Sequence, residues 1–180
     1  MLIIVDNTAR DSMYGLVYRV SVGAALPMID AVTDFYTIST YYQSQDLVGQ
    51  ANALVSMIVI NLIFQVSIVL GVYQKKGDMV KIRETLICLF FLRPIVDAFR
   101  VSINHEDEEL AVNSTSYMII NKSIELATES IPACVLQLYV WLARPDEAGT
   151  YTLVSIGVCA LTTVFTSALI SFDYDTDEVS

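Results

Sequence analysis

Charged residues are scarce in this chain of 180 residues: Asp, Glu, Lys and Arg make up 17% of it, whereas about 25% is usual in soluble domains. Hydrophobic residues make up 54% of the chain and gather in long runs. This excess of apolar side chains excludes an ordinary soluble domain. The composition predicts a multi-pass integral membrane protein, an all-α helical bundle that forms a single domain over residues 1–180.

The residue types that carry enzyme chemistry are few. His105 is the single histidine, and the HEDEE run that it begins lacks the second histidine of a zinc-binding helix. The three cysteines, Cys88, Cys134 and Cys159, show no paired spacing of the kind that forms a disulfide framework or a zinc site. We find no nucleophile–base pair, phosphate-binding glycine loop or cofactor motif. The sequence therefore predicts that the protein is not an enzyme and has neither a metal site nor a cofactor.

The chain also has no basic patch, and its formal net charge is −10. Much of the acid lies in two hydrophilic segments, residues 105–110 and 173–178, which we interpret as solvated. Because binding to phosphates depends on clustered Lys and Arg, nucleic acid is not an expected partner. Membrane lipids are the expected partners, and a second copy of the chain or another membrane subunit is an open alternative.

Five segments reach the roughly 20 residues that a helix needs to cross the hydrocarbon core. They lie near residues 20–42, 52–73, 84–103, 117–142 and 151–172. Lys and Arg are concentrated before the first segment and between the second and third, which predicts a cytoplasmic N-terminus. Five crossings would then put the C-terminus outside the cell or in a lumen, with the protein in the plasma membrane or an endomembrane.

Carboxylates inside the predicted spans are the strongest functional signal, because charge within the bilayer is costly and by default functional. The first span carries Asp30 and Asp34, and the fourth carries Glu125 and Glu129. The members of each pair are four residues apart and therefore project from one helical face. Each aspartate costs about 2.5–3.5 kcal/mol at a helix centre on the insertion scale. We therefore expect the first helix to need neighbours that accept its polar face.

The third predicted span adds Arg93, Asp97 and Arg100 along one helical stripe. Arg93 and Asp97 can pair within the helix, or the arginines can reach acids on other helices. The spans then hold five acids against two arginines, so either some acids are protonated through desolvation or the stripe faces a water-filled groove. The groove hypothesis predicts an intramembrane polar pathway of Asp30, Asp34, Arg93, Asp97, Arg100, Glu125 and Glu129. A set of structural clamps is the alternative.

Three amide side chains also fall inside predicted spans. Asn61 and Gln65 lie four residues apart in the second span, and Gln137 lies in the fourth. Amides often hold membrane helices together through interhelical hydrogen bonds. We therefore predict that these three residues serve polar helix packing.

Three stretches resemble the XK-related membrane proteins, a family that includes phospholipid scramblases. IDAVTDFYTISTYYQSQD resembles the family's opening helix, with its spaced aspartates and aromatic pair. ELATESIPACVLQLYVWL is similar to the family's Glu-Ser-x-Pro followed by Leu-Gln-Leu-Tyr, and LFFLRPIVDAFR is comparable to a helix with an internal arginine. The likeness covers roughly residues 25–145, in a family whose members are longer.

The resemblance implies a membrane protein that scrambles or otherwise handles lipids through a hydrophilic path. It implies that this path is formed or supported by Asp30, Asp34, Arg93, Glu125 and Glu129. Two other functions stay open from the residues alone. The surplus of acids is also typical of a cation or proton pathway, and a charged face can bind another membrane protein in a non-transporting structural subunit.

Overall fold

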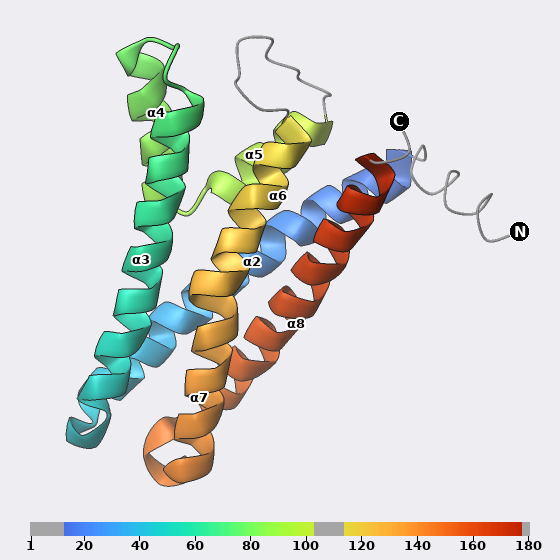
Figure 1. The fold of residues 1–180 in the computed structure, drawn as a ribbon. Coiled ribbons are helices and arrows are strands. Elements are labelled where there is room, and N and C mark those ends of the chain that lie inside the picture. The colour runs from blue at the N-terminus through green and yellow to red at the C-terminus, as the bar shows by residue number, and fades with distance from the viewer. Residues whose placement is uncertain (1–12, 103–113, 178–180) are drawn as a thin grey trace, which may run out of the picture.

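The computed structural model describes residues 13–102 and 114–177, and within these ranges every regular element is a helix (Figure 1). This confirms the all-α prediction. The elements are α2 (Met13–Gln43), η1 (Gln45–Leu47), α3 (Val48–Val72), α4 (Asp78–Leu89), α5 (Arg93–Ser102), α6 (Ser114–Glu125), the π-helical turn η2 (Leu126–Ser130), α7 (Ile131–Ala143) and α8 (Pro145–Asp177).

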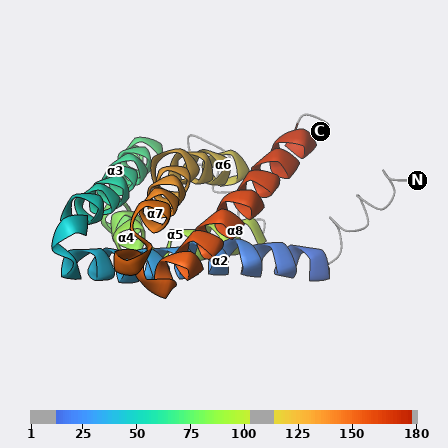
Figure 2. The ribbon, with the colours of Figure 1, turned by 90° about the horizontal axis from the view of Figure 1, so that it is seen from below.

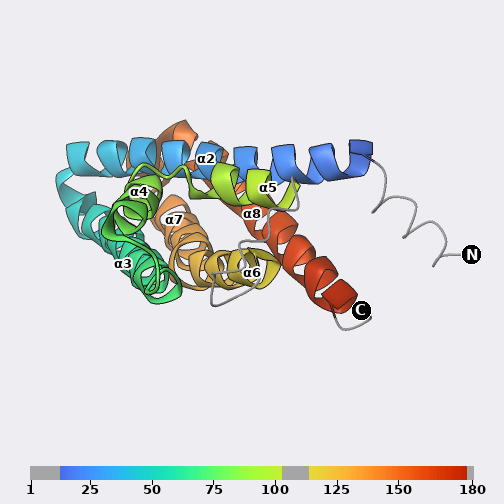
Figure 3. The ribbon, with the colours of Figure 1, turned by 90° about the horizontal axis from the view of Figure 1, so that it is seen from above.

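Helix α2 lies along one side of the bundle. Seen from below and from above, α3, α6 with α7, and most of α8 lie on the same side of α2, and the beginning of α8 projects past α2 (Figure 2 and Figure 3). α2 packs directly against α8, α5 and α3. The beginning of α2 and the end of α8 lie at the same end of the bundle, which we call the upper end after its place in Figure 1. The turns from α2 to α3 and from α7 to α8 lie at the lower end.

Among the described residues, three helices are long and apolar enough to cross a membrane: Gln45–Val72, Ser116–Ala143 and Pro145–Ser171. The prediction of five spans is therefore wrong in number. α2 has the length, with 31 residues, and it carries Asp30 and Asp34, whose charges cost free energy inside a bilayer. Its polar face must therefore be covered by neighbouring helices.

The predicted third span, residues 84–103, is two short helices. α4 has 12 residues and α5 has 10, so at about 1.5 Å per residue each reaches roughly half of a ~30 Å hydrocarbon core. The chain reverses at Phe91, whose φ of 56° lies in the left-handed region. Pro94 follows in the first turn of α5, where a residue without an N–H is accommodated. Both helices lie in the upper half of the bundle (Figure 1), so the segment is a hairpin rather than a crossing.

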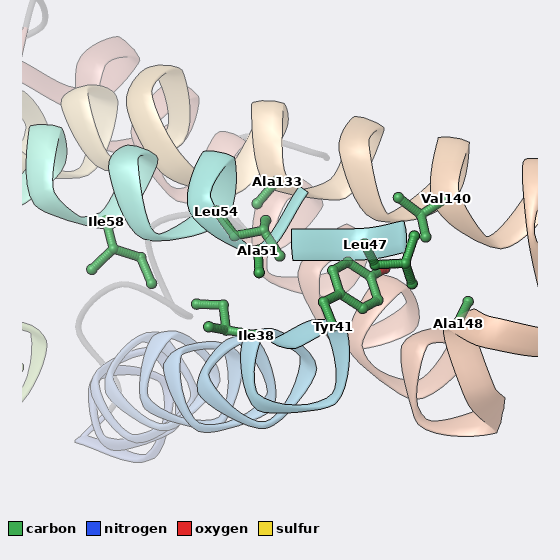
Figure 4. Close-up of a cluster of buried hydrophobic side chains, with 9 residues drawn as sticks. All are labelled: Ile38, Tyr41, Leu47, Ala51, Leu54, Ile58, Ala133, Val140 and Ala148. Atoms are coloured by element: carbon green, nitrogen blue, oxygen red, sulfur yellow. The ribbon is translucent and has the colours of Figure 1, made fainter. Parts of the chain in front are cut away.

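The main hydrophobic core lies towards the lower end, where α2, α3, α7 and the beginning of α8 meet (Figure 4). Its side chains come from segments distant in the sequence, so the core joins the two halves of the chain. Tyr41 and Leu47 are among its fully buried members. The cluster consists of Ile38, Tyr41, Leu47, Ala51, Leu54, Ile58, Ala133, Val140 and Ala148.

Polar contacts join the two lower turns. The Ser44 hydroxyl donates a hydrogen bond to the Glu147 carboxylate at 2.7 Å, and the Arg144 guanidinium lies 3.0 Å from the Asp46 carboxylate. Gly149 has a φ of +70°, a conformation that favours glycine, and allows the chain to turn into the long part of α8. The lower end is therefore closed by these contacts as well as by the core.

Cysteine labelling tests the hairpin. The five-crossing scheme separates Lys75 from Ser114 by the membrane. Lys75 belongs to the turn from α3 to α4 and Ser114 begins α6, and in the hairpin both this turn and the beginning of α6 lie at the upper end (Figure 1). A membrane-impermeant maleimide should therefore label Lys75→Cys and Ser114→Cys from the same side of the membrane, and Asp146→Cys from the other. The wild-type chain, in which Cys88 and Cys159 are buried, measures the background. Labelling of Lys75→Cys and Ser114→Cys from opposite sides would contradict the hairpin.

Candidate functional site

A small polar cavity lies between α2, α3, the α4–α5 hairpin and the η2 turn. Its volume is about 20 Å³, which is room for one or two water molecules. Because η2 interrupts the middle of the apolar helix Ser116–Ala143, the cavity lies near the middle of that helix. Its charged and amide lining residues are Asp30, Asn61, Gln65, Arg93, Glu125 and Glu129.

The π-helical turn presents Glu129 to this cavity. Within Leu126–Ser130 the backbone is wider than an α-helix, and the N–H of Ile131 bonds to the carbonyl of Leu126, five residues earlier. Pro132 follows, and its ring has no N–H with which to continue the α-helical ladder. The local sequence therefore favours a break in regular hydrogen bonding at the position of the buried carboxylate.

Two amides of α3 support the Glu129 carboxylate. The Asn61 amide nitrogen donates a hydrogen bond to it, and the Gln65 amide nitrogen donates to the Asn61 side-chain oxygen at 3.3 Å. All three side chains are buried. Polar helix packing is the prediction for Asn61 and Gln65. Asn61 links α3 to η2, Gln65 supports Asn61 within α3, and both lie in the wall of the cavity.

Arg93 neutralises part of the negative charge of the carboxylates beside the cavity. Its side chain is 4% exposed, and it forms ion pairs with Asp97 at 3.0 Å and with Glu84 at 3.1 Å. The guanidinium also lies over the Tyr117 ring, 4.5 Å from its centroid, a favourable cation–π arrangement. Arg93 thus joins α4, α5 and α6. Among the alternatives left open by the sequence, the pair with Asp97 within the helix is present.

Glu84 is a site residue that the sequence analysis missed. It is fully buried and lies 3.0 Å from Arg83 as well as pairing with Arg93. In one continuous helix, residues nine apart point to opposite faces, since each residue turns the helix by about 100°. Only the break between α4 and α5 brings Glu84 to Arg93. The available signal was Pro94, which marks a helix beginning.

Acids remain in excess around the cavity. Glu84 adds a sixth carboxylate to the five counted from the sequence, and Arg93 is already engaged by two of them. One carboxylate oxygen of Asp30 is buried without a hydrogen-bond partner. Glu125 lines this cavity and a second one of about 20 Å³ that reaches Lys122 on α6. The polar lining therefore continues from the middle of the bundle towards the upper end.

Other predicted pathway residues lie elsewhere. Asp97 lines the second cavity. Asp34 lines neither cavity and instead accepts hydrogen bonds from Gln137 at 2.7 Å and Ser155 at 3.2 Å. Gln137 thereby joins α7 to α2, a contact of the kind predicted for helix packing. The backbone of Arg100 belongs to α5, but its side chain lies outside the described residues.

The charged groups do not form a metal site in the part of the chain that the structure describes, where no three His, Cys, Asp or Glu side chains are grouped as ligands. What the arrangement offers is a buried region with charges of both signs. It can bind water or another small polar group inside an otherwise apolar bundle.

The apolar helices and the charged interior together define an integral membrane protein. A family model described as XK-related protein matches residues 19–172. The chain therefore belongs to the XK-related family. The match extends the likeness beyond residues 25–145 and includes most of α8. Comparison with curated proteins gave no match, and comparison with solved structures gave none either.

Replacing Glu84 tests the buried ion pairs. Glu84→Ala leaves Arg93 with one fewer carboxylate and should lower the free energy of unfolding by about 3 kcal/mol, because a buried charge then lacks compensation. Asp78→Ala removes a carboxylate from the same helix, but that side chain is 94% exposed and its pair with Lys81 should contribute little. Unfolding in detergent micelles measures both variants. Equal stability of the two would show that the Glu84–Arg93 pair does not stabilise the hairpin.

Proposed function

We propose that this chain is a lipid-handling protein that acts as a passive phospholipid scramblase and not as an enzyme. The observation that carries the proposal is the convergence of Asp30, Glu125, Glu129 and Arg93 on one cavity inside a bundle with an apolar surface. A headgroup crossing the hydrocarbon region loses its water, and polar side chains along its course substitute for that water. The acyl chains stay in the surrounding lipid.

The mixture of charges fits a zwitterionic headgroup. A carboxylate such as Glu129 attracts the ammonium group of the lipid, and Arg93 attracts its phosphate. A site for simple cations has no need of a buried guanidinium beside the acids. The chemistry therefore favours membrane phospholipids as the partners of this site.

Passage of a headgroup requires the bundle to open, because a cavity of about 20 Å³ holds water but not a phospholipid headgroup. The α4–α5 hairpin is the element best suited to move. It consists of two short helices and contributes Phe91, Arg93 and Pro94 to the cavity wall. Its displacement from α2 would widen the cavity towards the lipid.

In this proposal the protein crosses the membrane several times, with the upper end of the bundle in the cytoplasm. Lys75, Lys76, Lys81 and Arg83 lie between α3 and the middle of α4, near that end (Figure 1). Basic residues near membrane helices favour the cytoplasmic side. The beginning of α2 and the end of α8, both at the upper end, then lie on the cytoplasmic side. The membrane itself is the plasma membrane or an endomembrane.

Reconstitution tests the proposal. Purified protein is reconstituted into vesicles that contain a fluorescent phospholipid. If the protein moves lipid between leaflets, labelled lipid from the inner leaflet should reach the outer leaflet, where a reductant added outside quenches it. The double variant Asp30→Asn, Glu129→Gln should slow this movement, because both carboxylates lose their charge while their shape is kept. Asp78→Asn removes the same kind of charge from an exposed site and is the matched control. Absence of lipid movement with the wild-type chain would refute the function, and an unchanged rate in the double variant would refute the role of these residues.

A further inference from the structure

A second polar feature runs along α2 below the cavity. Asp30, Asp34, Thr37 and Tyr41 follow one another at spacings of four, three and four residues, so they share one helical face. They are buried, with exposed fractions that fall from 6% at Asp30 to 0% at Tyr41. At 1.5 Å per residue, this column is roughly 16 Å long. It leads from the cavity towards the lower end of the bundle.

Polar side chains of two other helices face this column. Asp34 accepts hydrogen bonds from Gln137 of α7 and Ser155 of α8. Thr152, one turn before Ser155, is also buried. α8 packs along both α2 and α7, so these hydroxyls and amides lie between helices rather than at the lipid surface. The column is therefore enclosed by protein.

Several polar atoms in the column have no hydrogen-bond partner within the protein. They are Thr37 Oγ1, Gln137 Oε1 and, at the cavity end, one oxygen of Asp30. The Tyr41 hydroxyl has the Thr152 side chain as a polar neighbour, but makes no hydrogen bond of normal geometry. Buried polar atoms in folded proteins are almost always satisfied, and ordered water satisfies those that protein groups do not. These atoms along one column are the groups with which water would form hydrogen bonds.

We propose that this column holds a file of water molecules that conducts protons between the central cavity and the lower end. Water and hydroxyl groups both accept and donate hydrogen bonds. Each member of the file accepts a proton from one neighbour and releases another to the next, so no group is consumed. The Asp34 carboxylate holds the proton midway. The function is separate from lipid movement, and Asp30 is the residue that the column shares with the cavity proposed for lipid.

An apolar ring limits the file at its lower end. The Tyr41 ring lies beside Leu47, and Val140 and Ala148 belong to the same buried cluster (Figure 4). Beyond this ring, Glu147 lies at the lower turn. Apart from the Tyr41 hydroxyl, which belongs to the file, the ring has no polar side-chain atoms with which to hold water, so it controls the rate at which protons leave. Such a narrow path suits protons rather than larger ions.

Proton flux in vesicles tests the inference. The vesicles hold a pH-sensitive dye, and a potassium diffusion potential drives protons across their membrane. The internal pH should change faster in vesicles with the wild-type protein than in vesicles without protein. Asp34→Asn keeps an oxygen that accepts from Gln137 and Ser155, but cannot hold the proton, so its flux should fall to that of protein-free vesicles. Leu47→Ala thins the ring and should raise the flux. Asp78→Asn should behave as wild type.

Several results would overturn the proton path: wild-type flux no greater than that of protein-free vesicles, unchanged flux in Asp34→Asn, or unchanged flux in Leu47→Ala. Lipid movement is recorded on the same vesicles. Lipid movement without proton flux therefore rejects the path alone, and proton flux without lipid movement rejects the scramblase proposal alone.

Radiolytic hydroxyl-radical footprinting tests the bound water without reference to activity. Radicals form from water next to the side chain, so Tyr41 should be modified in the intact folded protein although its exposed fraction is 0%. Tyr73 is almost as buried and packs edge-to-face on the Tyr117 ring, and it should be modified more slowly. Protection of Tyr41 equal to that of Tyr73 would show that the column is dry.

Discussion

A guanidinium buried in an apolar bundle must be neutralised where it lies, and this constraint organises the upper half of the protein. Arg93 meets it with Asp97 on its own helix and Glu84 on the preceding one. These pairs draw α4 and α5 into a hairpin instead of a crossing helix. Removal of one partner leaves a buried charge, whereas the intact set roughly balances its own desolvation. The ion pairs therefore determine the shape of the hairpin more than they add net stability.

The remaining polar groups divide into two regions along α2. Above, Asp30 and the supported Glu129 face a water-sized cavity that Arg93 shares. Below, Asp34 faces Gln137 between α2 and α7. Apolar side chains cover the outside of the same helices. The bundle thus keeps its polar groups inside and presents hydrocarbon to lipid, which is the arrangement that makes buried charge tolerable in a membrane.

Much of this organisation can be predicted from residue patterns. Helical content, the family and the placement of Asp30 and Asp34 on one face all follow from composition, motif and spacing. The different surroundings of those two aspartates, Asp30 at the cavity and Asp34 bonded to Gln137 and Ser155, do not follow from these patterns. Helix periodicity says that two side chains share a face, but α2 is long enough for Asp30 to face a cavity shared with α5 and η2 while Asp34 bonds to side chains of α7 and α8.

The sequence by itself determined the contacts that depend on local helix geometry, such as the Arg93–Asp97 pair, because four residues bring two side chains to one face of any α-helix. Only the tertiary structure decided that Glu84 also reaches Arg93 and that Asn61 reaches Glu129. The first contact needs the reversal at Phe91 and the second needs α3 beside η2. Both depend on how helices pack against each other, and that packing is a property of the whole chain rather than of any one segment.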